Sequence, residues 1–246
     1  MKKTELVLAM MGMMIFLCAY SQAGHRDGGS FQKDSALIVR AGMYLPSGNS
    51  LLWEQNEEFL TFRMADWNAF TYGFGFKLGA NDHLNVNFCF DYYRKKRATQ
   101  YRDYVNANGY PITQDLKLTL VPLTVAAEFL PFGRYEEGRR KFGKTPMKIQ
   151  PFIGAGVGLY IYRYEEIGNQ IDFRDMSIYD AYFISEGQAG GVFITGGMDV
   201  PIGHNATFTM EGRYHWVKTP LSPDFVGFDD FDLGGAQFMF GFGYRF

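Results

Sequence analysis

The chain has 246 residues, of which 47% are hydrophobic, 17% aromatic and 20% charged, with a formal net charge of -2. This length is compatible with one all-β domain, and the near-neutral charge gives no indication of a nucleic-acid partner. The two cysteines are Cys18 and Cys89, and Cys18 lies in a segment expected to be removed, so no intramolecular disulfide is expected in the mature chain.

The first 23 residues have the pattern of a secretory signal peptide. Lys2 and Lys3 precede an apolar run over residues 6–19, and Ser21-Gln22-Ala23 is a small-x-small cleavage site. The apolar run is shorter than the roughly 20 residues that a membrane-spanning helix needs. Cys18 could alternatively be a lipoprotein acceptor. We therefore expect export and cleavage after residue 23, followed by a polar, disordered segment over residues 24–35.

From residue 36 onward, apolar and polar side chains alternate, which is the pattern of β-strands with one apolar face. The expected strands are 36–45, 67–79, 83–93, 115–130, 148–164, 188–202, 206–218 and 235–246. The clearest hairpin joins the second strand to the third through Ala80-Asn81-Asp82, a tight turn. We expect one all-β domain over residues 36–246.

The last strand, residues 235–246, has an aromatic residue at every second position. Because strand side chains alternate between faces, the aromatic residues share one face. These residues are Phe238, Phe240, Phe242, Tyr244 and Phe246, and the opposite face carries Gln237, Met239, Gly241, Gly243 and Arg245. A soluble sheet could show the same alternation, but here the sequence stops on the last aromatic residue.

Gly241, Tyr244 and the terminal Phe246 resemble the C-terminal assembly signal of bacterial outer-membrane barrels, although Met239 stands where that family usually has a polar residue. The resemblance implies that the barrel-assembly machinery recognises this strand as a transient partner. It also implies an eight-stranded antiparallel up-and-down transmembrane β-barrel in the outer membrane of a Gram-negative bacterium. Such a barrel satisfies its backbone hydrogen bonds in lipid, and eight is an even strand number, as these barrels require.

The connections between the expected strands alternate in length. Those after the first, third, fifth and seventh strands are long, and those after the second and sixth are short, as in barrels with extracellular loops and periplasmic turns. The first loop, 46–66, contains Leu51, Leu52, Trp53 and Phe59, so we expect it to be partly ordered. The basic segment 131–147 after the fourth strand is long for a turn. We expect a monomer that contacts outer-membrane lipids and lipopolysaccharide.

Inward charges should pair with one another, because eight strands enclose a lumen barely wide enough for side chains. The expected lumen ion network consists of Arg40, Lys77, Glu128, Glu211, Arg213 and Arg245. It could be a structural filling or a gated polar path. A wide diffusion pore is not expected, since aqueous porins use about 16 to 18 strands.

Inward apolar side chains could line an apolar cavity in the outer half of the barrel. They are Leu116, Leu118, Leu120, Phe152, Tyr160, Tyr162 and Phe193. This feature resembles the outer membrane protein W family, eight-stranded barrels thought to pass small hydrophobic compounds toward the bilayer; the barrel pattern is also similar to that of outer membrane protein A. The same side chains could instead simply pack together. The predicted function is a structural role or narrow transport of a small hydrophobic solute.

Three further hypotheses concern chemistry or binding. Eight-stranded lipid A deacylases resemble this layout and carry a His-x-Ser pair, whereas His215 is followed by Trp216 and Val217, so we predict no enzymatic activity and no catalytic residues. Asp229, Asp230 and Asp232 could hold Ca²⁺ but lack the spacing of a known calcium loop, so neither a metal site nor a cofactor is expected. The aromatic-rich outer loops could bind a host surface, phage or a partner protein, which makes loop-mediated adhesion the alternative function.

Overall fold

A computed structural model describes residues 35–133, 149–202 and 205–246. The predicted signal peptide, the polar segment up to residue 34 and residues 134–147 of the basic segment lie outside the described residues. The barrel strands and the loops at the outer end of the barrel all lie within the three described ranges.

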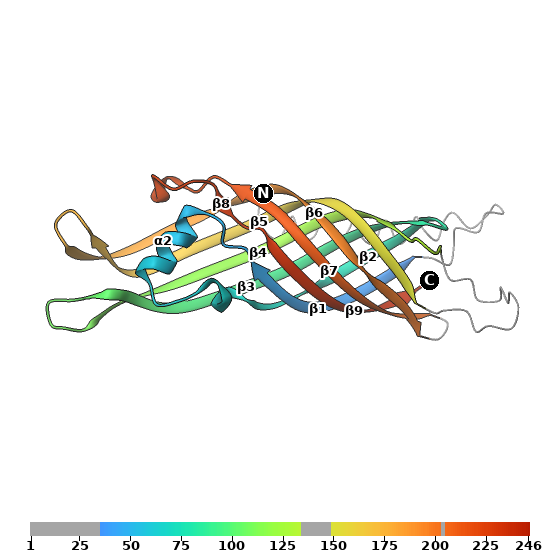
Figure 1. Ribbon diagram of the computed structural model, residues 1–246, viewed down its shortest axis with the longest axis horizontal. Coiled ribbons are helices and arrows are strands. Elements are labelled where there is room, and N and C mark those ends of the chain that lie inside the picture. The colour runs from blue at the N-terminus through green and yellow to red at the C-terminus, as the bar shows by residue number, and fades with distance from the viewer. Residues whose placement is uncertain (1–34, 134–148, 203–204) are drawn as a thin grey trace, which may run out of the picture.

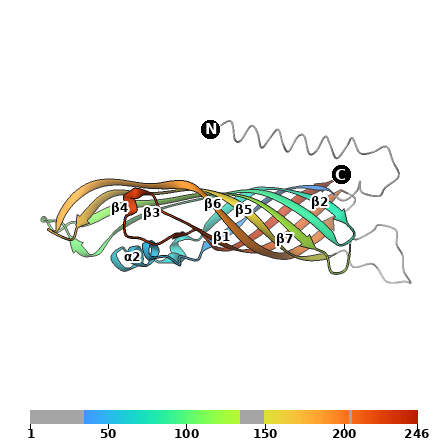
Figure 2. The same ribbon diagram turned by 90° about the horizontal axis from the view of Figure 1, so that it is seen from above.

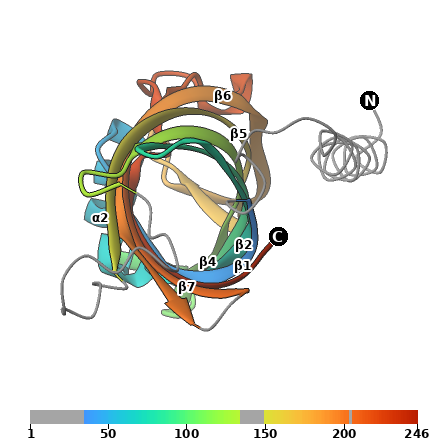
Figure 3. The same cartoon turned by 90° about the vertical axis from the view of Figure 1, so that its right-hand side faces the viewer.

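Eight long strands within these ranges form a closed antiparallel barrel. They are β1 (Ala36–Pro46), β2 (Ala69–Asn81), β3 (Leu84–Val105), β4 (Pro111–Phe129), β5 (Gln150–Asp172), β6 (Ser177–Ile202), β7 (Ala206–Thr219) and β9 (Gly235–Arg245). Consecutive strands pair with one another, and β9 pairs with both β7 and β1, which closes the ring seen along the axis in Figure 3. A two-residue strand, β8 (Phe231–Asp232), pairs with the end of β7. The predicted eight-stranded antiparallel barrel is confirmed.

The apolar faces of the strands point away from the barrel axis. On β9, Phe238, Phe240 and Phe242 are 55%, 51% and 66% exposed, while the intervening Gln237 and Met239 are buried. The other strands contribute further exposed apolar side chains, among them Val39, Phe74, Val125, Ile153, Val157, Val192, Ile194 and Trp216. We call this outward surface the apolar belt. A closed barrel leaves no unpaired backbone edge, so a belt of this extent is the surface that contacts hydrocarbon.

Strands β3 to β6 are much longer than the sequence predicts. Residues 94–105 continue β3 and pair with the first half of β4, and residues 165–187 mostly continue β5 and β6. The prediction of long loops over 94–114 and 165–187 is therefore wrong, because each segment is a strand hairpin with a short turn. Figures 1 and 2 show these four strands running past the ends of β1, β2, β7 and β9 as an outer extension.

The open side of the outer extension is covered by the loop after β1. This loop forms a helix, α2 (Leu51–Phe59), and a 3-10 turn, η2 (Met64–Trp67), and a second 3-10 turn, η3 (Pro223–Phe225), lies in the loop after β7. In Figures 1 and 2, α2 lies alongside the extension near the outer end of β1. Trp53 and Trp67 are both 0% exposed, which agrees with the expectation of a partly ordered loop, although Trp67 belongs to η2 and not to the predicted strand 67–79. No helix in the described residues is long and apolar enough to cross a membrane.

Candidate functional site

The lower lumen is crossed by a layer of ion pairs centred on Arg40. Arg40 on β1 donates through Nε to Oδ1 of Asp91 on β3 at 2.7 Å, and a second guanidinium nitrogen pairs with the other Asp91 oxygen. Its third nitrogen lies 2.9 Å from Oε2 of Glu211 on β7. Arg213 binds the remaining Glu211 oxygen at 2.6 Å. Facing strands are thus joined across the axis by buried, complementary charges.

Arg213 also contacts the opposite wall. One of its nitrogens donates to the Thr124 hydroxyl at 3.1 Å, another lies 3.1 Å from the Cys89 sulfur, and the guanidinium stands 5.0 Å above the Phe193 ring. Cys89 is a buried free thiol inside this layer. The guanidinium therefore fills the lumen as well as balancing charge.

A second layer is built around Lys77. Its ammonium lies 3.0 Å from Glu128 and 2.7 Å from Asp199, and 4.3 Å from the centre of the Phe152 ring. Asn87 donates to Glu128 at 2.6 Å and Thr209 donates to Asp199 at 2.7 Å. Buried charges are tolerated only when they are paired and hydrogen-bonded in this way.

The structure brings together most of the predicted ion network. Arg40, Glu211 and Arg213 meet in the first layer, and Lys77 meets Glu128 in the second. Arg245 does not join them: it is half-buried at the end of β9, and its Nε has no hydrogen-bond partner in the described residues. Arg245 is the last residue of β9 and pairs with Ala36, the first residue of β1, so it lies at the inner rim of the barrel and makes no ion pair with either layer in the described residues.

Sequence reasoning did not include Asp91 and Asp199 in the network. Both are buried at inward positions, whereas their strand neighbours Tyr92, Met198 and Val200 are partly or well exposed and point outward. Alternation alone could have placed them inward. Only the register between strands shows that they lie at the depth of Arg40 and Lys77.

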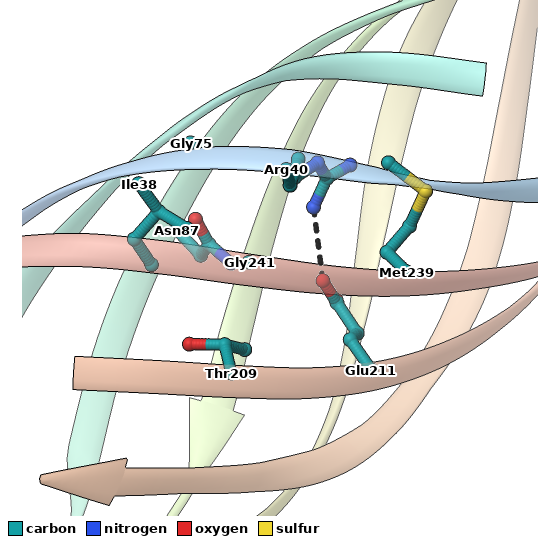
Figure 4. A pocket seen from close by; sticks show the side chains of 8 residues that line it. All are labelled: Ile38, Arg40, Gly75, Asn87, Thr209, Glu211, Met239 and Gly241. Carbon is teal, nitrogen blue, oxygen red and sulfur yellow. Dashed lines mark hydrogen bonds and ion pairs between the residues drawn. The ribbon is translucent and has the colours of Figure 1, made fainter. Parts of the chain in front are cut away.

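A small cavity lies beside the first layer. It measures about 10 Å³, which is roughly the room for one water molecule. Its lining residues are Ile38, Arg40, Gly75, Asn87, Thr209, Glu211, Met239 and Gly241, and Figure 4 shows the Arg40–Glu211 bridge spanning it. A space of this size passes no organic solute.

His215 marks the upper edge of the charged layers. Its Nδ1 is 2.7 Å from the Tyr160 hydroxyl and its Nε2 is 3.2 Å from Oε1 of Gln237, which in turn donates to Asp91. The imidazole is 2% exposed and faces the lumen. The Tyr160 phenol and the Gln237 amide thus contact its two ring nitrogens. In the described residues, neither ring nitrogen contacts a serine hydroxyl that could act as a nucleophile.

The upper lumen is filled by aromatic side chains from the covering loops. The Trp53 ring lies 4.9 Å from Trp67, 5.6 Å from Tyr164 and 5.4 Å from Phe231, measured between ring centres. Trp53 also donates through Nε1 to the backbone carbonyl of Asp232 at 3.2 Å. These rings form one buried cluster with apolar side chains of the strands. We call this group the aromatic plug.

The predicted apolar cavity residues divide between two levels. Those that belong to the cluster around the aromatic plug are Leu116, Leu118, Leu120, Tyr160 and Tyr162, and all are buried. Phe152 and Phe193 lie lower, against Lys77 and Arg213, so their assignment to an upper apolar cavity is corrected. Both rings share an inward face with the upper set but sit at a different depth.

Side-chain hydrogen bonds hold the loop after β1 in place. Asp232 accepts from the Ser47 hydroxyl at 2.6 Å and the Asn49 amide at 3.1 Å, and Asp229 accepts from the Leu51 amide at 2.8 Å. These two aspartates therefore fix the chain just before and at the start of α2. In the described part of the chain, no three His, Cys, Asp or Glu side chains gather as a metal site requires.

One buried carboxylate links α2 to the outer extension. Glu166 on β5 accepts from the Asn56 amide at 2.9 Å and from the Tyr164 hydroxyl at 2.7 Å. It lies beyond the apolar belt, and no cation pairs with it in the described residues. Burial raises the pKa of Glu166 above its ordinary value of 4.5, although both hydrogen bonds oppose this shift.

The residues of the predicted assembly signal occupy the closing seam. Gly241 faces Ile38, so closely that an added Cβ would lie 2.7 Å from a side-chain carbon. Tyr244 faces outward and accepts a hydrogen bond from Asn205 at 2.9 Å, and Phe246 stacks on Phe76 with ring centres 6.3 Å apart. Recognition by the assembly machinery stays a prediction.

Comparison with protein-family models finds no match, and comparison with curated proteins finds none either. Solved structures do share the fold. The outer membrane protein OprG from Pseudomonas aeruginosa superimposes with a TM-score of 0.51 at 17% identity, over 87% of this chain and 97% of that one. Neisserial surface protein A gives a TM-score of 0.44 at 14% identity, covering 89% and 100% of the two chains. Outer membrane protein W of E. coli gives 0.34 at 20% identity, covering 87% and 99%.

The likeness to OprG concerns the fold alone. The shared fold and the apolar belt together identify the chain as a small outer-membrane β-barrel, as the resemblance in the final strand predicts. The outer membrane of a Gram-negative bacterium is the location that follows from this fold and this belt.

Proposed function

We propose that the protein is a sealed outer-membrane barrel with a structural role. The observation that supports this proposal is the closure of the lumen at successive levels. Two layers of buried ion pairs bridge facing strands, and the aromatic plug fills the space above them. A barrel closed in this way anchors its outer extension in the membrane without conducting ions.

Planar-bilayer recordings and dye uptake test this role. The purified protein should give no single-channel steps above the bare-bilayer baseline and should not speed the entry of an apolar dye into vesicles beyond the rate in protein-free vesicles. A wide aqueous porin of about 16 strands, reconstituted in the same way, serves as the positive control. Channel steps, or dye entry faster than in protein-free vesicles, would contradict the sealed-barrel role.

Narrow transport of small hydrophobic solutes is the second candidate, and one observation favours it. The apolar upper compartment is closed on one side by a loop rather than by a strand, and this loop is held by side-chain hydrogen bonds to Glu166, Asp229 and Asp232. Displacement of α2 would expose Leu116, Leu118 and Leu120 to a solute. Weakening the attachment with Asn56→Ala should then raise apolar-dye uptake without raising ion conductance. Unchanged uptake would remove this candidate.

The proposal includes a monomer that contacts outer-membrane lipids and lipopolysaccharide and is delivered by the barrel-assembly machinery. We propose no enzymatic activity, because His215 is enclosed in the lumen, where a lipid ester cannot reach it. Loop-mediated adhesion stays a prediction.

A further inference from the structure

A row of basic side chains borders the outer edge of the apolar belt. On β3 the last apolar outward residue is Tyr92, and the next two outward positions hold Arg94 and Lys96. On β5 the outward residue Ile161 is followed by Arg163. The first charged residue beyond the belt is therefore a cation on both strands.

The strand between them carries the same sign. On β4, moving outward from Val121, the outward positions hold Thr119 and then Lys117. The register pairs Lys96 with Lys117 across β3 and β4, and Thr119 with both Arg94 and Arg163. Arg94, Lys96, Lys117 and Arg163 thus form one continuous surface, which we call the basic patch.

Acidic residues beside the cations and beyond them hold the basic patch. Lys96 pairs with Asp115 at 2.8 Å, and Arg163 pairs with Glu165 at 2.7 Å and Glu186 at 2.8 Å. Lys117 also pairs with Glu165. Asp115 and Glu165 each occupy the outward position directly beyond a cation of the patch. The cations are therefore oriented by acids that lie level with them or beyond them, while the side toward the belt carries no acid at these positions.

Each cation keeps unused donors. A lysine ammonium has three N–H groups and an arginine guanidinium has five. Lys96 and Lys117 each use one in these ion pairs, and Arg94 makes no ion pair in the described residues and is exposed. The patch can therefore donate several further hydrogen bonds to an anion with more than one oxygen.

We infer that the basic patch binds the phosphate groups of an outer-leaflet lipid, a phosphorylated glycolipid of the lipid A type. The occupant follows from position, because acyl chains that lie against the belt on β3, β4 and β5 place their headgroups at the level of the patch. It follows also from charge, because phosphate is anionic and accepts several hydrogen bonds at once. This inference requires the protein to be in a membrane but does not depend on whether the lumen is sealed.

Binding of defined lipids tests the inference. The purified full-length barrel in a neutral maltoside detergent is titrated with bis-phosphorylated lipid A and, separately, with the same lipid lacking both phosphates. Each Lys or Arg near a membrane surface contributes roughly fivefold in affinity for anionic lipid. The double variant Arg94→Gln with Lys117→Gln should therefore bind the phosphorylated lipid about 25-fold more weakly.

Lys218→Gln is the matched control. Lys218 is an exposed outward cation near the end of β7, next to the belt residue Trp216, and lies outside the basic patch. The Lys218→Gln variant should lose no more than about fivefold in affinity for the lipid, because it removes one surface charge and leaves the basic patch complete. Circular dichroism and the heat-dependent gel shift establish that each variant is folded, and Arg94→Gln alone repeats the test if the double variant does not fold.

Three results would overturn the inference. They are equal affinity for phosphorylated and dephosphorylated lipid A, equal loss of affinity in the patch variant and in Lys218→Gln, and binding of inorganic phosphate as tight as that of the lipid. The last result would indicate a site for a free anion rather than a lipid headgroup.

Discussion

Substituting methionine for Arg40 removes the cation that joins β1 to β3 and β7 inside the barrel. The guanidinium is 4% exposed and makes three contacts with carboxylate oxygens. Glu211 keeps its bonds to Arg213 and Thr195, both at 2.6 Å. Among the described residues, Asp91 keeps only the long contact from Gln237 at 3.4 Å. The substitution therefore leaves one buried carboxylate almost without compensation.

Breaking a buried ion pair from one side typically costs about 3–5 kcal/mol, so we expect Arg40→Met to lower the free energy of unfolding by that amount. Adding Asp91→Asn removes the stranded charge and should recover about 1–3 kcal/mol as a coupling energy. The matched control is Lys96→Met. Its partner Asp115 is 40% exposed and Lys96 itself is 59% exposed, so loss of this pair should cost under about 1 kcal/mol.

Reversible urea unfolding in lipid vesicles, followed by tryptophan fluorescence, measures these differences. The expected order of destabilisation is Arg40→Met first, then the double variant, then Lys96→Met. If Arg40→Met costs no more than Lys96→Met, or if Asp91→Asn adds to the damage in full, the buried ion layer is not the element that stabilises the barrel.

Three other predictions concern the seam and the plug. Gly42→Ala would place a Cβ 1.8 Å from the Phe238 carbonyl oxygen, so it should lower the free energy of unfolding by at least about 1–3 kcal/mol and abolish the heat-resistant folded band on a gel. Gly75→Ala, whose Cβ would be 3.6 Å from its nearest neighbour, should keep that band. Equal bands in the two variants would contradict the close approach of β1 and β9. Trp53→Ala should cost about 3–5 kcal/mol of plug packing and make residues 47–68 sensitive to protease, and a protected loop would contradict the assigned role of the ring. Because burial raises the pKa of Glu166 above 4.5, the docked loop binds the proton more tightly than the free loop, so docking is strongest below pH 4.5 and weakens as the pH rises through the raised pKa. Hydrogen exchange of the Leu52 amide should follow this trend, and Glu166→Gln should flatten it; a trend that survives the substitution would assign it to another group.

The transmembrane strands could be predicted from sequence because lipid imposes a strict rule on one face. On β9, and on the hairpin of β2 and β3, every outward residue must be apolar, and the alternation of Phe238, Phe240 and Phe242 follows directly. Beyond the belt this rule ends. Arg94 and Lys96 face water or headgroups, so residues 94–105 have the polarity of a loop, yet their backbone pairing with β4 continues.

The candidate site could be predicted only in part, and the missing information is depth. Alternation gives the inward direction of Asp91, Phe152 and Phe193, but their level along the axis depends on the register between strands, which sequence does not state. The filling of the upper lumen by Trp53 was likewise outside the reach of periodicity, because a loop that folds back onto the strands leaves no repeat. The apolar residues of that loop nevertheless indicated that it would be packed.

Depth-resolved tryptophan quenching tests most directly whether the outward faces contact hydrocarbon. Trp53 and Trp67 are fully buried, and Trp216 is 49% exposed on the belt, so lipids brominated in the acyl chain should quench Trp216 and leave the other two unaffected. Trp216→Phe should abolish this quenching, and Phe240→Trp added to that variant should restore it with a stronger response from bromines near the bilayer centre. Quenching of residues 216 and 240 by aqueous acrylamide, with no response to brominated lipid, would contradict the account.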